Sequence, residues 1–238
     1  MSNEIVVAFD LYGTLLSTAS IAKQLAEHFG EEKATTIATA WRKYQLEYTW
    51  RLNSMKQYKP FDTVTRASLH NALLESKVSL TDKETEDLMA AYDTLDIYPD
   101  AADCLSSLTA KPHIQAVVFS NGTHEMIASS IHKSPQLAKF SSSIQSIVSI
   151  DDVKQYKPAP ESYAHLARQV GKDPSSATDM QSIWLVSGNP FDIVGARTAG
   201  LSAAWIDRED KGWQDGLGEP TVVVQSLEQV VDAVSNHR

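Results

Sequence analysis

The chain of 238 residues is 42% hydrophobic and 21% charged, which is typical of a folded protein with one sizeable core, or with a core and a smaller inserted domain. Its 21 lysines and arginines face 30 aspartates and glutamates, and the net charge of -9 excludes the basic surface by which proteins bind nucleic acids or anionic membranes. The single cysteine, Cys104, can form no internal disulfide, and no apolar run approaches the roughly 18 residues of a membrane span. We therefore expect a cytoplasmic protein without a membrane segment.

Short apolar runs, each bounded by turn residues, predict the strands of one sheet. They span residues 5–9, 114–119, 144–148, 183–186 and 203–206. Helical patterns that end at a glycine separate the later runs, and the tail from residue 221 predicts a last strand and a closing helix. Strands that alternate with helices predict an α/β fold, with a doubly wound parallel sheet covered by helices on both faces.

The first and second predicted strands are about a hundred residues apart, which is far more than one crossover connection needs. The sequence between them has apolar residues at helical spacing, for example Ile21 and Leu25. We therefore predict an inserted α-helical cap domain at 17–95, and an α/β core domain made of 1–16 and 96–238.

Three of the predicted strands end in polar residues. Asp10 follows the first run, and Ser120 and Asn121 close the second. Ser187 and Asn189 follow the fourth. Because the carboxyl ends of parallel strands meet at one edge of a sheet, where α/β proteins gather their reactive groups, we expect a functional site there.

Each of these polar patterns also has an ordinary structural explanation. Asp10 can form an Asx turn, and Ser120 and Asp192 can cap helices. Lys157 can be a solvated surface residue, or a lysine that Pro158 holds beside a carboxylate in order to neutralise it. Taken singly, none of the patterns decides between structure and function.

Four segments in chain order carry a family resemblance: "FDLYGTL", "SNGT", "KPAPESY" and "SGNPFD". Together they resemble the successive signatures of the haloacid dehalogenase superfamily, and of its L-2-haloacid dehalogenase branch in particular. The segment "WRKYQLEYTW" adds Arg42 in the context typical of that branch. The resemblance extends over nearly the whole chain, although Gly188 and Pro190 depart from the usual sequence of the last signature.

Tyr12 separates two chemistries within the superfamily. Its phosphatases carry a second aspartate at this position, which protonates the leaving alkoxide and lends a backbone oxygen to Mg²⁺. Tyr12 cannot serve as that acid near neutral pH, whereas a departing halide needs no proton. Asn189 stands where a phosphatase has an anionic residue near its metal, and Mg²⁺ prefers carboxylate oxygens. We therefore expect a reaction without a metal or any other cofactor.

The resemblance implies that the chain hydrolyses short L-2-haloacids to D-2-hydroxy acids through an ester on Asp10, with a small halogenated carboxylic acid as its substrate. Lys157 would hold Asp10 ionised, and Asp192, supported by Asn189, would activate the hydrolytic water. The catalytic residues that the resemblance implies are Asp10, Thr14, Arg42, Lys157, Tyr163, Ser187, Asn189 and Asp192. Family likeness alone also predicts a homodimer.

The resemblance likewise implies a set of substrate-binding residues. They are Leu11, Tyr12 and Ser120 at the substrate carboxylate, Arg42, Asn121 and Phe191 at the halide, and Leu46 at the wall of the pocket. Leu46 is included because positions 42, 45, 46 and 49 share one helix face, a pattern that ordinary helix packing also produces.

Two alternatives stay open on the sequence alone. One is a phosphatase of the same superfamily, against which Tyr12 and Asn189 argue. The other is a non-catalytic relative that binds a metabolite, against which the presence of a nucleophile, a cation and a water-activating acid argues. Halide and phosphate release, assayed side by side, distinguish them.

Overall fold

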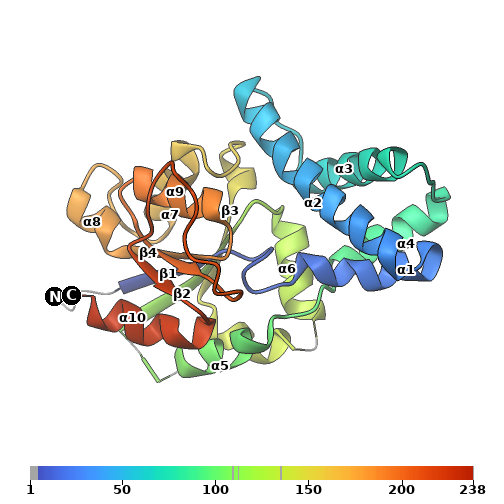
Figure 1. The fold of residues 1–238 in the computed structure, drawn as a ribbon. Coiled ribbons are helices and arrows are strands. Elements are labelled where there is room, and N and C mark those ends of the chain that lie inside the picture. Colours follow the sequence, from blue (N-terminus) through green and yellow to red (C-terminus); the bar gives the residue numbers. More distant parts are fainter. Residues whose placement is uncertain (1–4, 109, 112, 135, 238) are drawn as a thin grey trace.

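The computed structural model describes residues 5–108, 110–111, 113–134 and 136–237, and these residues form a six-stranded parallel sheet between layers of helices (Figure 1). The strands are β1 Ile5–Phe9, β2 Ile114–Ser120, β3 Ser146–Ser149, β4 Ile183–Ser187, β5 Ser202–Ile206 and β6 Val222–Val224. Their order in the sheet is β3-β2-β1-β4-β5-β6. The chain builds outward from β1 to β3 and then returns to the other side of β1 as β4. The order therefore reverses between β1 and β4, and α/β proteins open a crevice at such a point.

The central strands are buried on both faces because helices cover the sheet on each side. Every residue of β1 (IVVAF) and of β4 (IWLVS) is buried. Helices α5 and α10 lie on one face, and α7 and α9 lie on the other (Figure 1). The bounds of the core helices are α5 Pro99–Leu108, α6 His124–Lys133, α7 Pro160–Gln169, α8 Ala177–Gln181, α9 Pro190–Thr198 and α10 Val230–Asn236. The predicted doubly wound α/β fold is confirmed.

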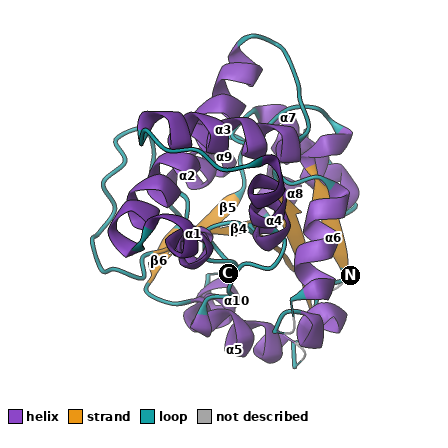
Figure 2. Cartoon of the chain, turned by 90° about the vertical axis from the view of Figure 1, so that its right-hand side faces the viewer, coloured by secondary structure: helices purple, strands orange, loops and turns teal. Residues whose placement is uncertain are grey.

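A second group of helices occupies the chain between β1 and β2. Its members are α1 Ala22–Phe29, α2 Glu31–Ser54, α3 Phe61–Glu75 and α4 Asp82–Tyr92. Figure 2 views the molecule from the side of these helices, which lie in front of the sheet. They pack on one another through Trp41, whose indole N–H donates to the backbone oxygen of Thr65 at 2.8 Å and whose ring meets that of Tyr92 at 5.2 Å.

Two chain segments join the helical group to the sheet, and they lie side by side. Leu16 and Ile97 form an antiparallel bridge, Ser17 N donates to Asp96 O at 2.8 Å, and Tyr98 N donates to Leu15 O at 2.9 Å. Helices α1 to α4 all fall within the predicted cap, but the boundaries drawn at 17 and 95 stay a prediction. The ends of the predicted core domain, at residues 1 and 238, lie outside the described residues.

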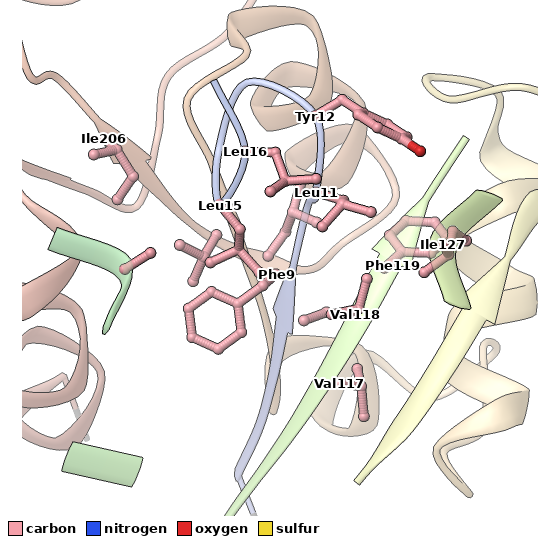
Figure 3. Packing of buried hydrophobic residues seen from close by; sticks show 14 of the residues in the cluster. Phe9, Leu11, Tyr12, Leu15, Leu16, Val117, Val118, Phe119, Ile127 and Ile206 are labelled. Carbon is pink, nitrogen blue, oxygen red and sulfur yellow. The ribbon is translucent and has the colours of Figure 1, made fainter. Parts of the chain in front are cut away.

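The turn that follows β1 is anchored by buried side chains. Leu11, Leu15 and Leu16 are fully buried, and Figure 3 shows them beside Phe9 of β1. Tyr12 extends away from this group (Figure 3), and its ring contacts aromatic rings of the helical group. The apolar residues around Asp10 therefore fix the backbone from which its carboxylate projects.

Helix α9 approaches α7 and the segment before it so closely that a Cβ atom at one of its positions would overlap its neighbours. A Cβ atom at Gly195 would lie 2.4 Å from the Tyr163 hydroxyl oxygen and 2.5 Å from Cβ of Pro158. We expect Gly195→Ala to lower the free energy of unfolding by about 1–3 kcal/mol through overpacking. Urea titration measures the change, with Gly216→Ala as the control, because a Cβ there meets nothing within 4 Å. Equal midpoints for the two variants would contradict the prediction.

Candidate active site

Asp10 lies directly after β1, at the point where the strand order reverses. Its N–H continues the sheet by donating to Val186 O at 3.0 Å, and its side chain is nearly buried, with the residue 5% exposed. Lys157 Nζ donates to Oδ1 of Asp10 at 2.8 Å. The Thr14 hydroxyl and the Asn189 side-chain amide both donate to Oδ2 at 2.8 Å. The structure therefore surrounds this carboxylate with hydrogen-bond donors, which fix its position.

Lys157 is buried together with two carboxylates. Its ammonium lies 2.8 Å from Asp10, 2.6 Å from Asp192 and 3.2 Å from the backbone oxygen of Phe119. Burial lowers the pKa of Lys157, but the attraction of Asp10 and Asp192 outweighs it, and the pKa is raised above its ordinary value of 10.5. The ammonium is therefore charged throughout the neutral range. While its carboxylate partners are ionised, its contribution to stability is complete below pH 10.5, and it is lost as the pH rises through the higher pKa of the folded state.

Asp192, near the start of α9, is completely buried, and both of its carboxylate oxygens accept hydrogen bonds. Lys157 donates to Oδ2, and the Tyr163 hydroxyl donates to Oδ1 at 2.8 Å. Burial raises the pKa of Asp192 against the opposing effect of Lys157, and the charge of Asp10 raises it further. Burial also raises the pKa of Tyr163 well above its usual range, so its hydroxyl stays a donor.

The structure corrects one predicted pairing, that of Asn189 with Asp192. The side-chain amide of Asn189 donates to Asp10 and, at 3.0 Å, to the backbone oxygen of Tyr12. Asn189 meets Asp192 only through the backbone, where its carbonyl oxygen accepts from Asp192 N at 3.1 Å. Asn189 is the N-cap residue of α9, but its side chain makes no capping hydrogen bond and is bonded to the turn after β1 instead.

The turns after β1 and β4 interlock through Thr14. Its hydroxyl donates to Asp10, accepts from the N–H of Gly188 at 2.9 Å and lies 3.5 Å from the Ser187 hydroxyl. A Cβ atom at Gly188 would lie 2.6 Å from the backbone oxygen of Gly13. The departure of Gly188 from the usual family sequence thus has a local reason, the close approach of two backbones.

Arg42 reaches this site from helix α2. Its Nη2 donates to Tyr12 O at 3.1 Å and to Asn189 Oδ1 at 3.2 Å, and its Nη1 donates to Gln45 at 2.7 Å. Gln45 is fully buried, and it also accepts from the Tyr92 hydroxyl at 3.1 Å. The sequence placed position 45 on the same helix face as Arg42 but gave no reason to choose Gln45 over Leu46. Gln45 is therefore a site residue that the prediction missed.

The remaining predicted binding residues divide into polar and apolar members. Ser120 is buried and accepts from Gly122 N at 3.1 Å, while Oδ1 of Asn121 accepts from the backbone N–H of Lys157 at 3.0 Å. Leu46 is a half-buried residue of α2. Phe191, also half-buried, meets the ring of Trp50 edge-on at a centroid distance of 5.4 Å.

Leu11 and Tyr12 supply backbone groups on the other side of the site. Within the described part of the chain, neither of their N–H groups forms a hydrogen bond. The Tyr12 ring stacks on Phe61 at 5.8 Å, and its hydroxyl lies 3.4 Å from the Ser130 hydroxyl. Burial raises the pKa of Tyr12, so its side chain is neutral.

Arg208 is a second residue that the sequence did not indicate, and it is bonded to the turn after β1. Its guanidinium donates to Thr14 O at 2.9 Å and makes two hydrogen bonds to Asp100, at 2.9 and 3.0 Å. It also lies 3.9 Å from the ring centroid of Tyr98. No local pattern marks Arg208, because its partners are far from it in the sequence.

The groups that face Asp10 do not resemble a Mg²⁺ site. Mg²⁺ requires oxygen ligands, and around Asp10 the neighbours are an ammonium, an amide N–H and a hydroxyl that donates. Among the described residues, no group of three or more His, Cys, Asp or Glu side chains is arranged to hold a metal ion.

Cys104 is buried on α5, and burial raises the pKa of its thiol to about 12, as expected of a packing residue. No helix in the described ranges is long and apolar enough to cross a membrane.

Known proteins resemble this chain in sequence and in fold. A family model described as haloacid dehalogenase-like hydrolase matches residues 6–200. The (S)-2-haloacid dehalogenase 4A of Burkholderia cepacia is 35% identical over 205 residues, which cover 84% of this chain and 82% of that protein. The (S)-2-haloacid dehalogenase of Pseudomonas fluorescens is 30% identical over 236 residues, which cover 99% of each. The structure of L-2-haloacid dehalogenase from Xanthobacter autotrophicus with chloropropionic acid covalently bound matches with a TM-score of 0.86 at 27% identity, and the match covers 98% of this chain and 99% of that chain.

The parallel sheet and the buried aspartate after its first strand define a hydrolase of the haloacid dehalogenase-like class, and the chain belongs to that family, in the branch of the (S)-2-haloacid dehalogenases. The family and the enzyme class predicted from the four sequence segments are thereby confirmed. The roles of the individual site residues stay predictions.

The position of Lys157 between two buried carboxylates generates a stability prediction. We expect Lys157→Met to lower the free energy of unfolding at pH 7 by about 3–5 kcal/mol, because it leaves both carboxylates without their cation. The deficit should shrink as the pH falls, since protonation can then neutralise the carboxylates. Urea titration at a series of pH values measures it. Lys83→Met, which removes an exposed partner of Asp87, is the control and should leave the midpoint unchanged; a deficit that is constant with pH would contradict the interpretation.

Proposed function

We propose that the protein hydrolyses the carbon–halogen bond of short L-2-haloacids and releases halide and the D-2-hydroxy acid. The observation that carries the proposal is the buried, donor-bound carboxylate of Asp10 at the carboxyl end of β1, followed by Tyr12 in place of an acid. The relatives from Burkholderia cepacia and Pseudomonas fluorescens, both (S)-2-haloacid dehalogenases, support the same reaction.

In the first step, one carboxylate oxygen of Asp10 attacks C2 of the substrate from the side opposite the halogen. A C–O bond forms, the carbon–halogen bond breaks, and the halide leaves with the bonding electrons, so C2 is inverted once. The related structure with chloropropionic acid covalently bound supports an intermediate of this kind. Lys157, Thr14 and Asn189 hold Asp10 in place for the attack.

In the second step, water attacks the ester carbonyl carbon of Asp10, and Asp192 takes a proton from this water. The bond between that carbon and the ester oxygen breaks, the proton passes from Asp192 to the departing oxygen, and the hydroxy acid leaves with the oxygen that Asp10 supplied. Asp10 releases the second proton of the water and returns to its carboxylate form. The raised pKa of Asp192 makes it a stronger base than an ordinary aspartate, and Tyr163 and Lys157 fix its orientation.

Substrate recognition uses groups on both sides of Asp10. The Ser120 hydroxyl and the free N–H groups of Leu11 and Tyr12 bind the substrate carboxylate. Arg42 stabilises the departing halide with those of its N–H groups that Tyr12, Asn189 and Gln45 do not occupy. Three further residues bind the substrate in this proposal: Asn121 and Phe191 contact the halide, and Leu46 forms part of the wall of the pocket.

The two alternatives are less well supported. A phosphatase would need an acid at Tyr12 and oxygen ligands around Asp10, where the neighbours are donors. A non-catalytic binding protein would have no use for three charges buried together at a cost of several kcal/mol. The proposal also includes a cytoplasmic location, which the composition of the sequence predicts, and a homodimer, which family likeness alone predicts.

We expect the enzyme to release chloride from L-2-chloropropionate and to form D-lactate, because a single displacement at C2 inverts that carbon. The D enantiomer should react poorly, since its halogen points away from Arg42 when its carboxylate is bound. Ion chromatography of chloride and phosphate, with a phosphate monoester assayed in parallel, and chiral analysis of the product measure this. Retention of configuration, equal rates for the enantiomers, or release of phosphate alone would refute the proposal.

A single turnover in ¹⁸O water distinguishes an Asp10 nucleophile from an Asp10 that only activates water. With enzyme in excess, the ester mechanism predicts unlabelled hydroxy acid and one ¹⁸O atom in the carboxylate of Asp10. Mass spectrometry of the peptide that contains "FDLYGTLL" and of the product reads both positions. Labelled product together with an unlabelled peptide would make Asp10 a general base.

A further inference from the structure

Asn53, near the end of α2, makes a reciprocal contact with the core. Its side-chain N–H donates to the backbone oxygen of Tyr156 at 2.6 Å, and its side-chain oxygen accepts from the backbone N–H of Tyr156 at 3.0 Å. One amide side chain thus forms hydrogen bonds with both the N–H and the carbonyl oxygen of a residue 103 positions away in the chain. The residue that it holds directly precedes Lys157.

The segment around Tyr156 is clamped from several sides by the loop between α2 and α3. The Tyr156 ring is fully buried and stacks on Tyr58 at 5.3 Å, and its hydroxyl donates to the backbone oxygen of Lys59 at 2.6 Å. The Tyr58 hydroxyl donates to Asp151 in the same core segment. Of these contacts from the helical group, that of Asn53 is the one made to the backbone next to Lys157. Within the core, the same Tyr156 oxygen also accepts from Ala159 N at 2.9 Å.

The Lys157 backbone leads directly to the catalytic carboxylate. Its N–H donates to Asn121 at 3.0 Å, and its ammonium contacts Asp10 and Asp192. The distance from Asn53 to the nucleophile is therefore spanned by two residues, Tyr156 and Lys157. A small displacement of this backbone moves the ammonium away from Asp10, and misplacement by about 1 Å can cost up to a hundredfold in rate.

We propose that Asn53 is a positioning residue of the helical group, which holds the Tyr156–Lys157 backbone and thereby keeps the Lys157 ammonium against Asp10. The contact exists only while the end of α2 lies on the core. Docking of these helices is thus coupled to the placement of the cation beside the nucleophile. This inference rests on the proposed dehalogenation for its kinetic consequence, but not for its structural one.

Two substitutions separate the hydrogen bonds from the size of the side chain. Asn53→Ala removes both hydrogen bonds, and Asn53→Asp keeps the size and the acceptor but replaces the donor by an oxygen that faces the Tyr156 carbonyl. We expect each to lower kcat for L-2-chloropropionate about tenfold with KM within about twofold, because Asn53 touches no substrate and acts only through Lys157. Tyr58→Phe is the matched control: it removes a hydrogen bond between the same two parts of the chain, keeps the ring, and should leave kcat within about twofold.

Amide hydrogen exchange gives a readout that does not depend on turnover. The informative amide is that of Lys157, which is bonded to Asn121 and not to Asn53. Its exchange rate should rise about tenfold in Asn53→Ala and stay unchanged in Tyr58→Phe. The exchange rates of the β1 amides are the reference for global stability. An unchanged Lys157 amide in Asn53→Ala, or a kcat within twofold of the wild-type value, would overturn the inference. If the wild-type protein releases no halide, the proposed function fails, and hydrogen exchange alone decides the role of Asn53.

Discussion

The Lys157 ammonium between Asp10 and Asp192 is the interaction on which the rest of the site depends. Two carboxylates and one ammonium, all within 5% exposure, carry a net charge of one unit that water does not solvate. Burial of this kind is tolerated only where every charge has a close partner and the remaining lone pairs accept hydrogen bonds. Thr14, Asn189 and Tyr163 supply those hydrogen bonds. The trio is thus held as a unit, and the removal of Lys157 would leave both carboxylates without a cation.

This requirement sets the geometry of the fold around it. The three charges come from the end of β1, the segment before α7 and the first turn of α9, so these elements must approach to within the length of a hydrogen bond. Glycine at 188 and at 195 makes that approach possible, because a Cβ at either position would overlap a neighbouring atom. The helices α1 to α4 then complete the site from outside the sheet through Arg42 and, in our proposal, Asn53. Their docking brings both side chains to the carboxyl edge at once.

The sequence predicted most of the fold, and the family resemblance named the charged trio together with Thr14, Tyr163 and Asn189, but not the residue to which each of them bonds. The apolar runs that end at Asp10 and Ser187 indicated the strand ends, since period and composition are local properties. Arg42 entered only through the family resemblance, because an arginine on a mixed helix face is ordinarily solvated. The bond of Asn189 to Asp10, and the roles of Gln45, Arg208 and Asn53, could not be predicted. Each depends on contacts between residues far apart in the chain, and neutral amides on a helix carry no signal of burial.

The charge of the trio also bears on the proposed order of steps. When Asp10 becomes an ester it loses its negative charge, and the buried group passes from a net charge of minus one to neutral while the lost charge departs on the halide beside Arg42. Burial disfavours a net charge, so formation of the ester would relieve the trio of its uncompensated negative charge. Lys157 then faces only Asp192, which keeps that carboxylate ionised and available to take a proton from water. In the proposed reaction a single lysine would thus serve both steps, because it would hold the nucleophile in the first and the base in the second.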